Sequence, residues 1–136
     1  MSQGLIKVTP NRERAKSILK IIKVTLDMIE HIDSQKYPSN VTKEYYEIIR
    51  ELASVLLLLD GWKAYGEGAH KIQIQYLRDE YAIFSQAELM LMDELRIIRN
   101  KIAYDGLFLK PDYLNRRKED IRKIIGRLQD TIKLRL

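Results

Sequence analysis

Cysteine is missing from the 136-residue sequence, and histidine occurs only twice. The first absence excludes disulfides, thiolate metal ligands and cysteine nucleophiles, and it is typical of a protein kept in a reducing cytosol. The two histidines, His31 and His70, stand too far apart and too isolated to indicate a metal site. No glycine-rich phosphate-binding loop follows a predicted strand. The sequence therefore predicts neither a metal site nor a bound cofactor.

Long apolar runs are missing as well. No segment reaches the roughly 18 consecutive apolar residues of a membrane-spanning helix, and the first residues lack the apolar run of a signal peptide. The length suits one domain that buries its own core. We therefore expect a single domain over residues 1–136 that is soluble and cytoplasmic and has no membrane partner.

Glycine and proline are scarce, with six and three copies, and they fall between long segments of helical apolar periodicity. Four long helices and one short helix are predicted from these segments. Ends of the long helices are marked by capping residues, prolines and glycines, namely Thr9, Pro10, Pro38, Gly61, Ser85, Gly106 and Pro111, and the short helix is expected from about Ala69 to Arg78. The helix that ends at Gly61 is apolar on every side over residues 55–59, which predicts a central position. Because the loops between helices are short, we expect an all-α fold, an antiparallel up-and-down bundle of four to five helices.

The net charge of +5 is concentrated near the C-terminal end of the chain. Residues 110–136 hold nine Lys and Arg against four Asp and Glu, so this segment accounts for the whole excess. A basic segment is able to bind an anionic partner such as nucleic acid. On a helical wheel, however, Glu119 and Asp130 fall within the basic arc. We therefore interpret this arc as a solvated outer face.

The predicted helix between Ser85 and Gly106 has two apolar faces. One is a core stripe, formed by Ala87, Leu91, Leu95, Ile98 and Ile102. The other side interleaves apolar and polar side chains, namely Leu89, Met90, Met92, Ile97 and Tyr104 with Arg96, Arg99 and Asn100. Two interpretations are open, a helix covered on both sides within the bundle or a face that binds a partner. The arginines favour a partner, because at an interface they meet water or an anion, whereas burial without a carboxylate is costly.

The end of this helix, LRIIRNKIAYDG over residues 95–106, resembles the HEPN family. Members of this family are small helical bundles with a short R-N-x-x-x-H motif near a helix end. Arg99 stands at the position of the family arginine, Asn100 at the polar residue after it, and Tyr104 at the position of the histidine. The GWKAYGEGAHK stretch, residues 61–71, is similar to the break between bundle helices in this family.

The resemblance implies a homodimer in which the motifs of two copies meet at the interface. It also implies an RNA-directed, toxin-like protein, a metal-independent endoribonuclease where active, with a small nucleotidyltransferase as antitoxin partner. Arg99 would contact the RNA phosphate, Asn100 would orient the phosphate or the arginine of the other copy, and Tyr104 would replace the histidine. Leu89, Met90, Arg96 and Ile97 would lie at the interface. The alternative is a non-catalytic dimeric interaction module that pairs with a nucleotidyltransferase-type partner.

The replacement of histidine by Tyr104 bears directly on catalysis. Histidine is suited to accept a proton from a ribose hydroxyl because its pKa lies near neutrality, whereas the reference pKa of tyrosine is about 10. Tyr104 has two further roles open to it, a hydrogen bond with Asn100 or stacking on a base. For His70 we expect a capping or packing role, and for His31 a place at the end of the first helix. Tyr45 and Trp62 are expected in the core.

Overall fold

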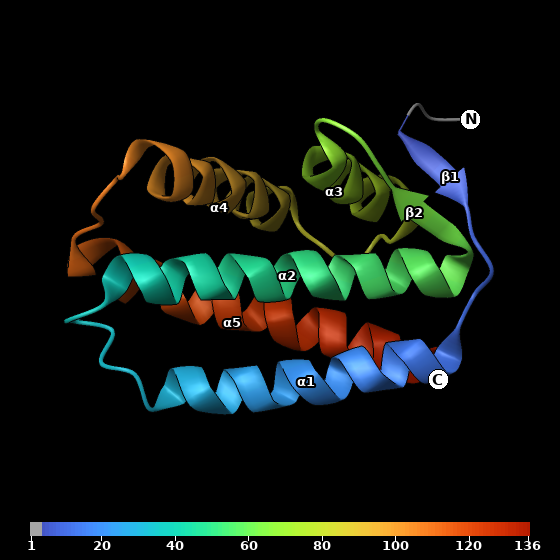
Figure 1. Cartoon of the computed structure of the whole chain (residues 1–136), viewed down its shortest axis with the longest axis horizontal. Helices are drawn as coiled ribbons and strands as arrows, with labels where there is room; N and C mark the ends of the chain where they lie inside the picture. Colours follow the sequence, from blue (N-terminus) through green and yellow to red (C-terminus); the bar gives the residue numbers. More distant parts are fainter. Residues whose placement is uncertain (1–3) are drawn as a thin grey trace.

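The computed structural model describes residues 4–136 and consists of five helices and two short strands (Figure 1). In chain order these are β1 (Leu5–Lys7), α1 (Arg12–Glu30), α2 (Pro38–Asp60), β2 (Trp62–Ala64), α3 (Ala69–Glu80), α4 (Gln86–Asp105) and α5 (Pro111–Leu134). The all-α bundle predicted from the sequence is confirmed. No helix within residues 4–136 combines the length and apolar character that a membrane crossing requires.

The helix α2 lies at the centre of the bundle and packs against all four other helices. Residues 55–59 of α2 are shielded from solvent on every side: Val55, Leu56, Leu57 and Leu59 are buried and Leu58 is half-buried. The prediction of a central helix is therefore confirmed. The physical reason is that a segment apolar on every side avoids water only when other elements surround it.

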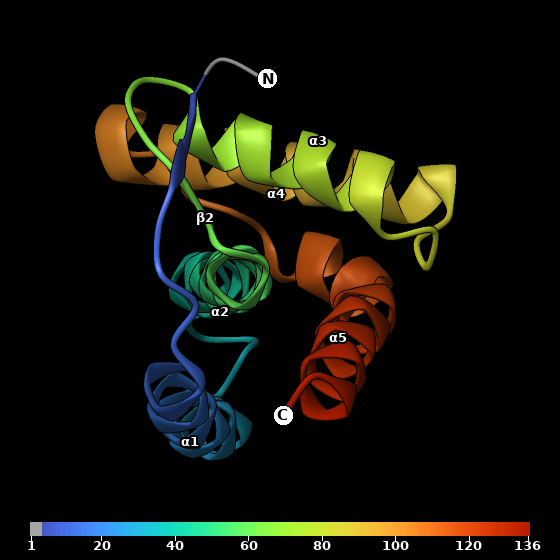
Figure 2. The same ribbon diagram turned by 90° about the vertical axis from the view of Figure 1, so that its right-hand side faces the viewer.

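The other helices cover different sides of α2. In Figure 2, α1 and α2 are seen along their axes, whereas α3 and α4 run side by side across the view, so this pair crosses α2 steeply. The helix α5 runs parallel to α2, in contrast to the expected up-and-down order. Their starts are joined by the Leu109 amide, which donates to Ser39 Oγ, and their ends by the ion pair of Arg135 with Asp60. Between α2 and α5, the chain passes through α3 and α4. These two helices bring it back to the end of the bundle at which α2 begins.

The helix boundaries follow the capping signals with one exception. Ser85 and Glu88 form the predicted capping box, in which each side chain accepts a hydrogen bond from the backbone of the other. Gly61 and Gly106 end α2 and α4 in the left-handed conformation that glycine adopts without strain. The first helix begins at Arg12 and not at Pro10, because Asn11 is the N-cap and its side chain accepts from the Arg14 amide.

A two-stranded antiparallel sheet is present that the sequence does not predict. Its register pairs Leu5 with Ala64 and Lys7 with Trp62. The strands have three residues each, too few to establish an alternating pattern, and they pair across more than 50 positions of sequence. The sheet ties the start of the described chain to the connection between α2 and α3. Trp62 is half-buried there and not in the core, whereas Tyr45 is buried as predicted.

Candidate nucleic-acid-binding site

A polar cluster lies where α2, α3 and α4 meet, and Glu47 on α2 is its centre. One carboxylate oxygen of Glu47 accepts from Arg99 Nε on α4 at 2.8 Å. The other oxygen accepts from Arg50 Nε at 3.0 Å and from Arg50 Nη2 at 2.8 Å. A single carboxylate is therefore shared by two guanidinium groups from two helices. We call Glu47, Arg50, His70, Arg96 and Arg99 the arginine cluster.

Arg96 adds a third guanidinium group to the arginine cluster. Its Nε donates to Asp93 Oδ1 at 2.8 Å within α4. Three guanidinium groups thus stand against two carboxylates, Glu47 and Asp93, which leaves one positive charge in excess. The side chains of Arg99 and Arg50 are 19% and 32% exposed, so both remain partly accessible to an anion from solvent.

Arg96 and Arg99 have carboxylate partners within their own chain, and this corrects the prediction made for them. The sequence favours an interface for both because burying an arginine inside one chain without a carboxylate is costly. In the structure, Asp93 and Glu47 supply the carboxylates. The second pair is hidden from sequence because Glu47 lies 52 residues before Arg99 and becomes its neighbour only through the packing of α2 on α4.

Asn100 and Tyr104 surround Arg99 in different ways. Arg99 Nη1 donates to Asn100 Oδ1 at 3.2 Å, so the amide steadies the guanidinium group. The guanidinium carbon of Arg99 lies 6.0 Å from the centre of the Tyr104 ring, at the outer limit of a cation–π contact. Tyr104 itself is 77% exposed. The amide thus pairs with the arginine, and the tyrosine ring is open to solvent beside it.

The second apolar face of α4 is partly covered by its own chain. Met92 is fully buried, so its part of the face is covered within the bundle, as one of the two interpretations expects, whereas Ala87, expected in the core stripe, is exposed. Leu91 and Leu95 are buried as predicted. The buried arc is rotated toward Met92 because α4 packs against α2 and α3 at once.

Three large apolar side chains of α4 remain outside the core. Met90, Ile97 and Tyr104 are 64%, 42% and 77% exposed. They follow one another at intervals of seven residues and therefore lie along one side of the helix. We call these three residues the α4 stripe. Leu89, also expected on this face, is half-buried against the core.

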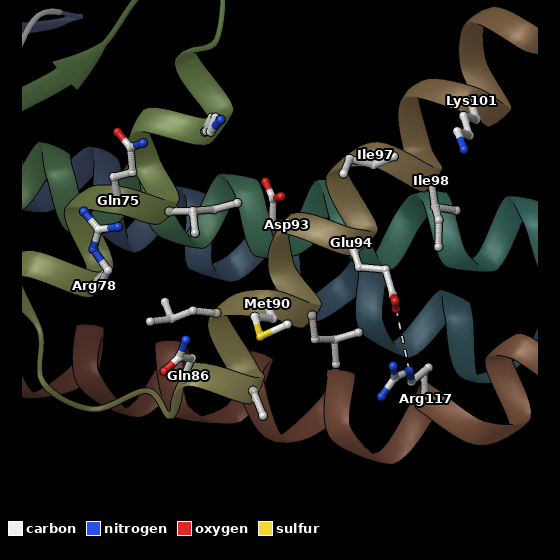
Figure 3. A pocket seen from close by; sticks show the side chains of 15 residues that line it. Gln75, Arg78, Gln86, Met90, Asp93, Glu94, Ile97, Ile98, Lys101 and Arg117 are labelled. Atoms are coloured by element: carbon white, nitrogen blue, oxygen red, sulfur yellow. Dashed lines mark ion pairs between the residues drawn. The ribbon is translucent and has the colours of Figure 1, made fainter.

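A groove of about 1150 Å³ opens between α3 and α4 beside the α4 stripe. Figure 3 shows Met90 and Ile97 along α4 in this groove, with Gln75 and Arg78 on α3 across from them. The ion pair of Glu94 with Arg117, drawn as a dashed line, lies at the side formed by α5. The apolar floor and polar rim suit a protein segment better than a compact charged ligand.

His70 is the member of the arginine cluster for which the sequence predicts only capping or packing. It lies in the first turn of α3, and its ring centre is 6.0 Å from that of the buried Tyr46, with the ring planes inclined by 57°. The packing role is thus present. His31, by contrast, ends α1 as expected, and its Nδ1 is 2.8 Å from the Asp27 carbonyl oxygen.

Burial and charge shift the pKa values of three groups in this region. Burial alone raises the pKa of Glu47, but hydrogen bonds and charges from Arg50 and Arg99 outweigh it and the pKa is lowered. Burial raises the pKa of Tyr46 to about 12. The pKa of His70 is lowered, first by burial and then by the positive charges of Arg50, Arg99 and Arg96, against the opposing charge of Glu47. At neutral pH, Glu47 is therefore ionised and His70 is neutral.

Four of the nine basic side chains in residues 110–136 are engaged in ion pairs within the bundle. Four arginines of α5 or its C-cap pair with acids of other helices, in the pairs Arg117–Glu94, Arg122–Glu30, Arg127–Glu88 and Arg135–Asp60. These pairs hold α5 against α1, α2 and α4. Other basic side chains of the arc, namely Arg116, Lys123 and Lys133, are exposed, as expected for a solvated outer face.

Glu47, Arg50 and His70 are site residues that the sequence did not identify. One signal was available for the first two, since an acid and a base three residues apart on one helix are placed to pair with each other. Among residues 4–136, no three His, Cys, Asp or Glu side chains are grouped so as to hold a metal ion. The chain matches no family model, no curated protein and no solved structure.

Proposed function

We propose that this protein is an HEPN-like, RNA-directed protein of the toxin-like group, which holds an RNA phosphate at the arginine cluster. The observation that carries the proposal is the sharing of Glu47 by Arg50 and Arg99. Each guanidinium group has five N–H donors, so both retain donors for a phosphate oxygen after binding the carboxylate. Tyr104, exposed beside Arg99, offers its ring face to an unpaired base.

A second copy of the chain completes this site in the proposal. The α4 stripe is an exposed apolar surface that reaches the arginine cluster at Tyr104, and its side chains gain from removal from water. Two copies joined through their α4 helices would bring two arginine clusters toward one RNA strand. Because such a homodimer contains two arginine clusters, it doubles their excess positive charge without any further basic residue in the chain.

Binding to single-stranded RNA tests the role of Arg99 at the phosphate. We expect Arg99→Ala to weaken binding and to reduce the slope of log affinity against log salt by about 0.7 for each phosphate that the variant no longer binds. Glu47 retains Arg50 as its partner in this variant, so the fold is preserved. Arg14→Ala is the matched control, because Arg14 is exposed on α1, which lies on the opposite side of α2 from α4. Equal binding by wild type and both variants would refute the assignment.

The mass of the protein in solution tests the dimer. Ile97→Asp places a charge within the α4 stripe and is expected to shift the protein to a monomer in sedimentation equilibrium. Val24→Asp, at a side chain 66% exposed on α1, is the control and should leave the dimer intact. A wild-type monomer, or a dimer that Ile97→Asp leaves unchanged, would contradict this part of the proposal.

The second candidate function is a non-catalytic interaction module that pairs with a nucleotidyltransferase-type partner. The groove between α3 and α4 favours it, because its apolar floor is continuous with the α4 stripe. In this case the protein would form its complex without RNA. The absence of RNA binding, together with a co-purified complex that Ile97→Asp disrupts, would distinguish it from the first proposal.

A further inference from the structure

One end of the bundle carries aromatic rings that the core does not use. Phe108, in the loop between α4 and α5, is 83% exposed, and Tyr104 at the end of α4 and Tyr37 at the N-cap of α2 are exposed as well. The α1–α2 and α4–α5 loops meet at the end of the bundle where α2 and α5 begin (Figure 1). We call Tyr37, Tyr104 and Phe108 the aromatic end.

The backbone holds Phe108 in place although its ring lies in solvent. The Leu107 amide donates to the Lys101 carbonyl oxygen on α4 at 3.0 Å. The Leu109 amide donates to Ser39 Oγ on α2 at 2.7 Å. Both neighbours of Phe108 are therefore fixed, one to each helix. An exposed ring on a fixed backbone contributes little to the core, but it is preorganised for a ligand.

The aromatic end is continuous with the arginine cluster. The guanidinium carbon of Arg99 lies 6.0 Å from the centre of the Tyr104 ring. Phe108 follows Tyr104 by four residues, which limits the distance between their Cα atoms to about 15 Å. The first of the two loop hydrogen bonds turns the chain back to α4, and the second brings it next to the start of α2, where Tyr37 lies. The cluster and the rings are therefore within reach of one short strand.

Cations accompany the rings, and this favours a nucleic acid over an apolar protein segment. Lys36 Nζ lies 5.5 Å from the centre of the Tyr37 ring, and Arg99 is beside the Tyr104 ring. Residues 99–110 hold three basic side chains and one acid, so this segment has an excess of two positive charges. Sites for single-stranded nucleic acid combine basic groups, which bind phosphates, with aromatic rings, on which bases stack. The cores of protein interfaces, by contrast, are depleted of lysine.

We propose that the aromatic end binds single-stranded RNA, with Tyr104 and Phe108 stacking on two unpaired bases of the strand whose phosphate Arg99 holds. Tyr37 extends this platform toward α2. The inference rests on the proposed function, and it names the class of RNA that the site takes. The bases of a duplex are stacked on one another and paired, so they do not lie on these rings. Because every base has a π face, the sequence of the strand matters little.

Fluorescence anisotropy with a short labelled oligoadenylate, alone and annealed to oligouridylate, tests this inference. We expect wild-type protein to bind the single strand at least about tenfold more tightly than the duplex.

Phe108→Leu is the direct test, because leucine retains an apolar side chain but has no ring. It should weaken binding of the single strand by about tenfold. The slope of log affinity against log salt should stay unchanged, because no phosphate contact is lost. Phe108→Trp retains a ring and should restore wild-type affinity. The matched control is Leu134→Ala, since Leu134 is 89% exposed at the opposite end of the bundle, where α5 ends.

The outcomes separate this inference from the proposed function. Equal affinity of wild type and Phe108→Leu for the single strand, or equal binding of single strand and duplex, overturns the aromatic end and leaves phosphate binding at the arginine cluster in place. A Phe108→Leu protein that loses its dimer but not its RNA affinity assigns the ring to a protein interface and overturns the inference. Wild-type protein that binds no RNA overturns both proposals. A tenfold loss in Phe108→Leu, with salt slope and thermal unfolding retained and affinity restored in Phe108→Trp, supports the inference.

Discussion

The substitution Glu47→Gln tests both the stability and the anion binding of the arginine cluster. Glutamine preserves the size of the side chain and one acceptor oxygen, but it removes the charge that Arg50 and Arg99 share. Hydrogen bonds to a charged group contribute about 1.5–3 kcal/mol, against about 1 kcal/mol for neutral partners. The side chains are 19–32% exposed, so solvent screens part of this difference. We expect Glu47→Gln to lower the free energy of unfolding at pH 7 by about 1–2 kcal/mol.

The effect of Glu47→Gln depends on pH with a definite sign. The pKa of Glu47 is lowered in the folded protein, so its contribution to stability is present above the unfolded pKa of 4.5 and is lost as the pH falls through the folded value. The difference between wild type and variant is therefore expected at pH 7 and should disappear in strong acid. Urea unfolding followed by circular dichroism at pH 3, 5 and 7 measures it. Equal stability at pH 7 would refute the description of Glu47 as the shared anion of the cluster.

Under the proposed function, the effect of Glu47→Gln on RNA affinity is opposite in sign to its effect on stability. Removal of the competing carboxylate frees two guanidinium groups for phosphate, so affinity for single-stranded RNA should rise although the fold is less stable. The slope of log affinity against log salt should steepen by about 0.7 for each additional phosphate bound. Glu51→Gln is the matched control, because Glu51 is on α2 and exposed. A weaker or unchanged RNA affinity in a folded Glu47→Gln protein would argue against phosphate binding at this site.

Three further predictions concern the framework around the site. Asp60 accepts hydrogen bonds from two tyrosines and Arg135, so Asp60→Asn should lower the free energy of unfolding by about 2 kcal/mol at pH 7. Because the pKa of Asp60 is lowered in the folded protein, this difference should vanish in acid. Unfolding at pH 7 and in acid measures it. The Tyr45 hydroxyl is buried with no hydrogen-bond partner among residues 4–136, so Tyr45→Phe should leave the melting temperature unchanged or raise it. Gly61→Ala should lower the free energy of unfolding in urea by about 1–2 kcal/mol, because φ is +86° and a Cβ would lie 3.3 Å from the Val8 carbonyl oxygen. Gly126→Ala within α5, by contrast, should raise it by about 0.5–1 kcal/mol.

The helices and the central position of α2 follow from local sequence. Apolar periodicity marks each helix, and Ser85, Gly61 and Gly106 mark ends through backbone hydrogen bonds that depend on residues within one turn. A helix apolar on every side has only one stable location, the interior. The sequence alone therefore determined the all-α class, the boundaries of most helices, and the central position of α2 among the other helices.

The surroundings of the α4 motif could be predicted only in part. Arg99, Asn100 and Tyr104 are recognisable because they are close together in one helix, and their exposed apolar neighbours Met90 and Ile97 follow from the same helical wheel. The wheel did not decide whether Met92 is buried, because a wheel gives the angle between residues and not the direction from which neighbouring helices approach.

Only the tertiary structure decided which groups surround Arg99. Glu47 and His70 come from two other helices, and their distance from the motif along the chain exceeds the reach of any local pattern. Burial and charge at that meeting point then fix their protonation, leaving Glu47 ionised and His70 neutral. Local periodicity specifies helices because their hydrogen bonds are local, whereas a site built from three helices depends on how those helices pack.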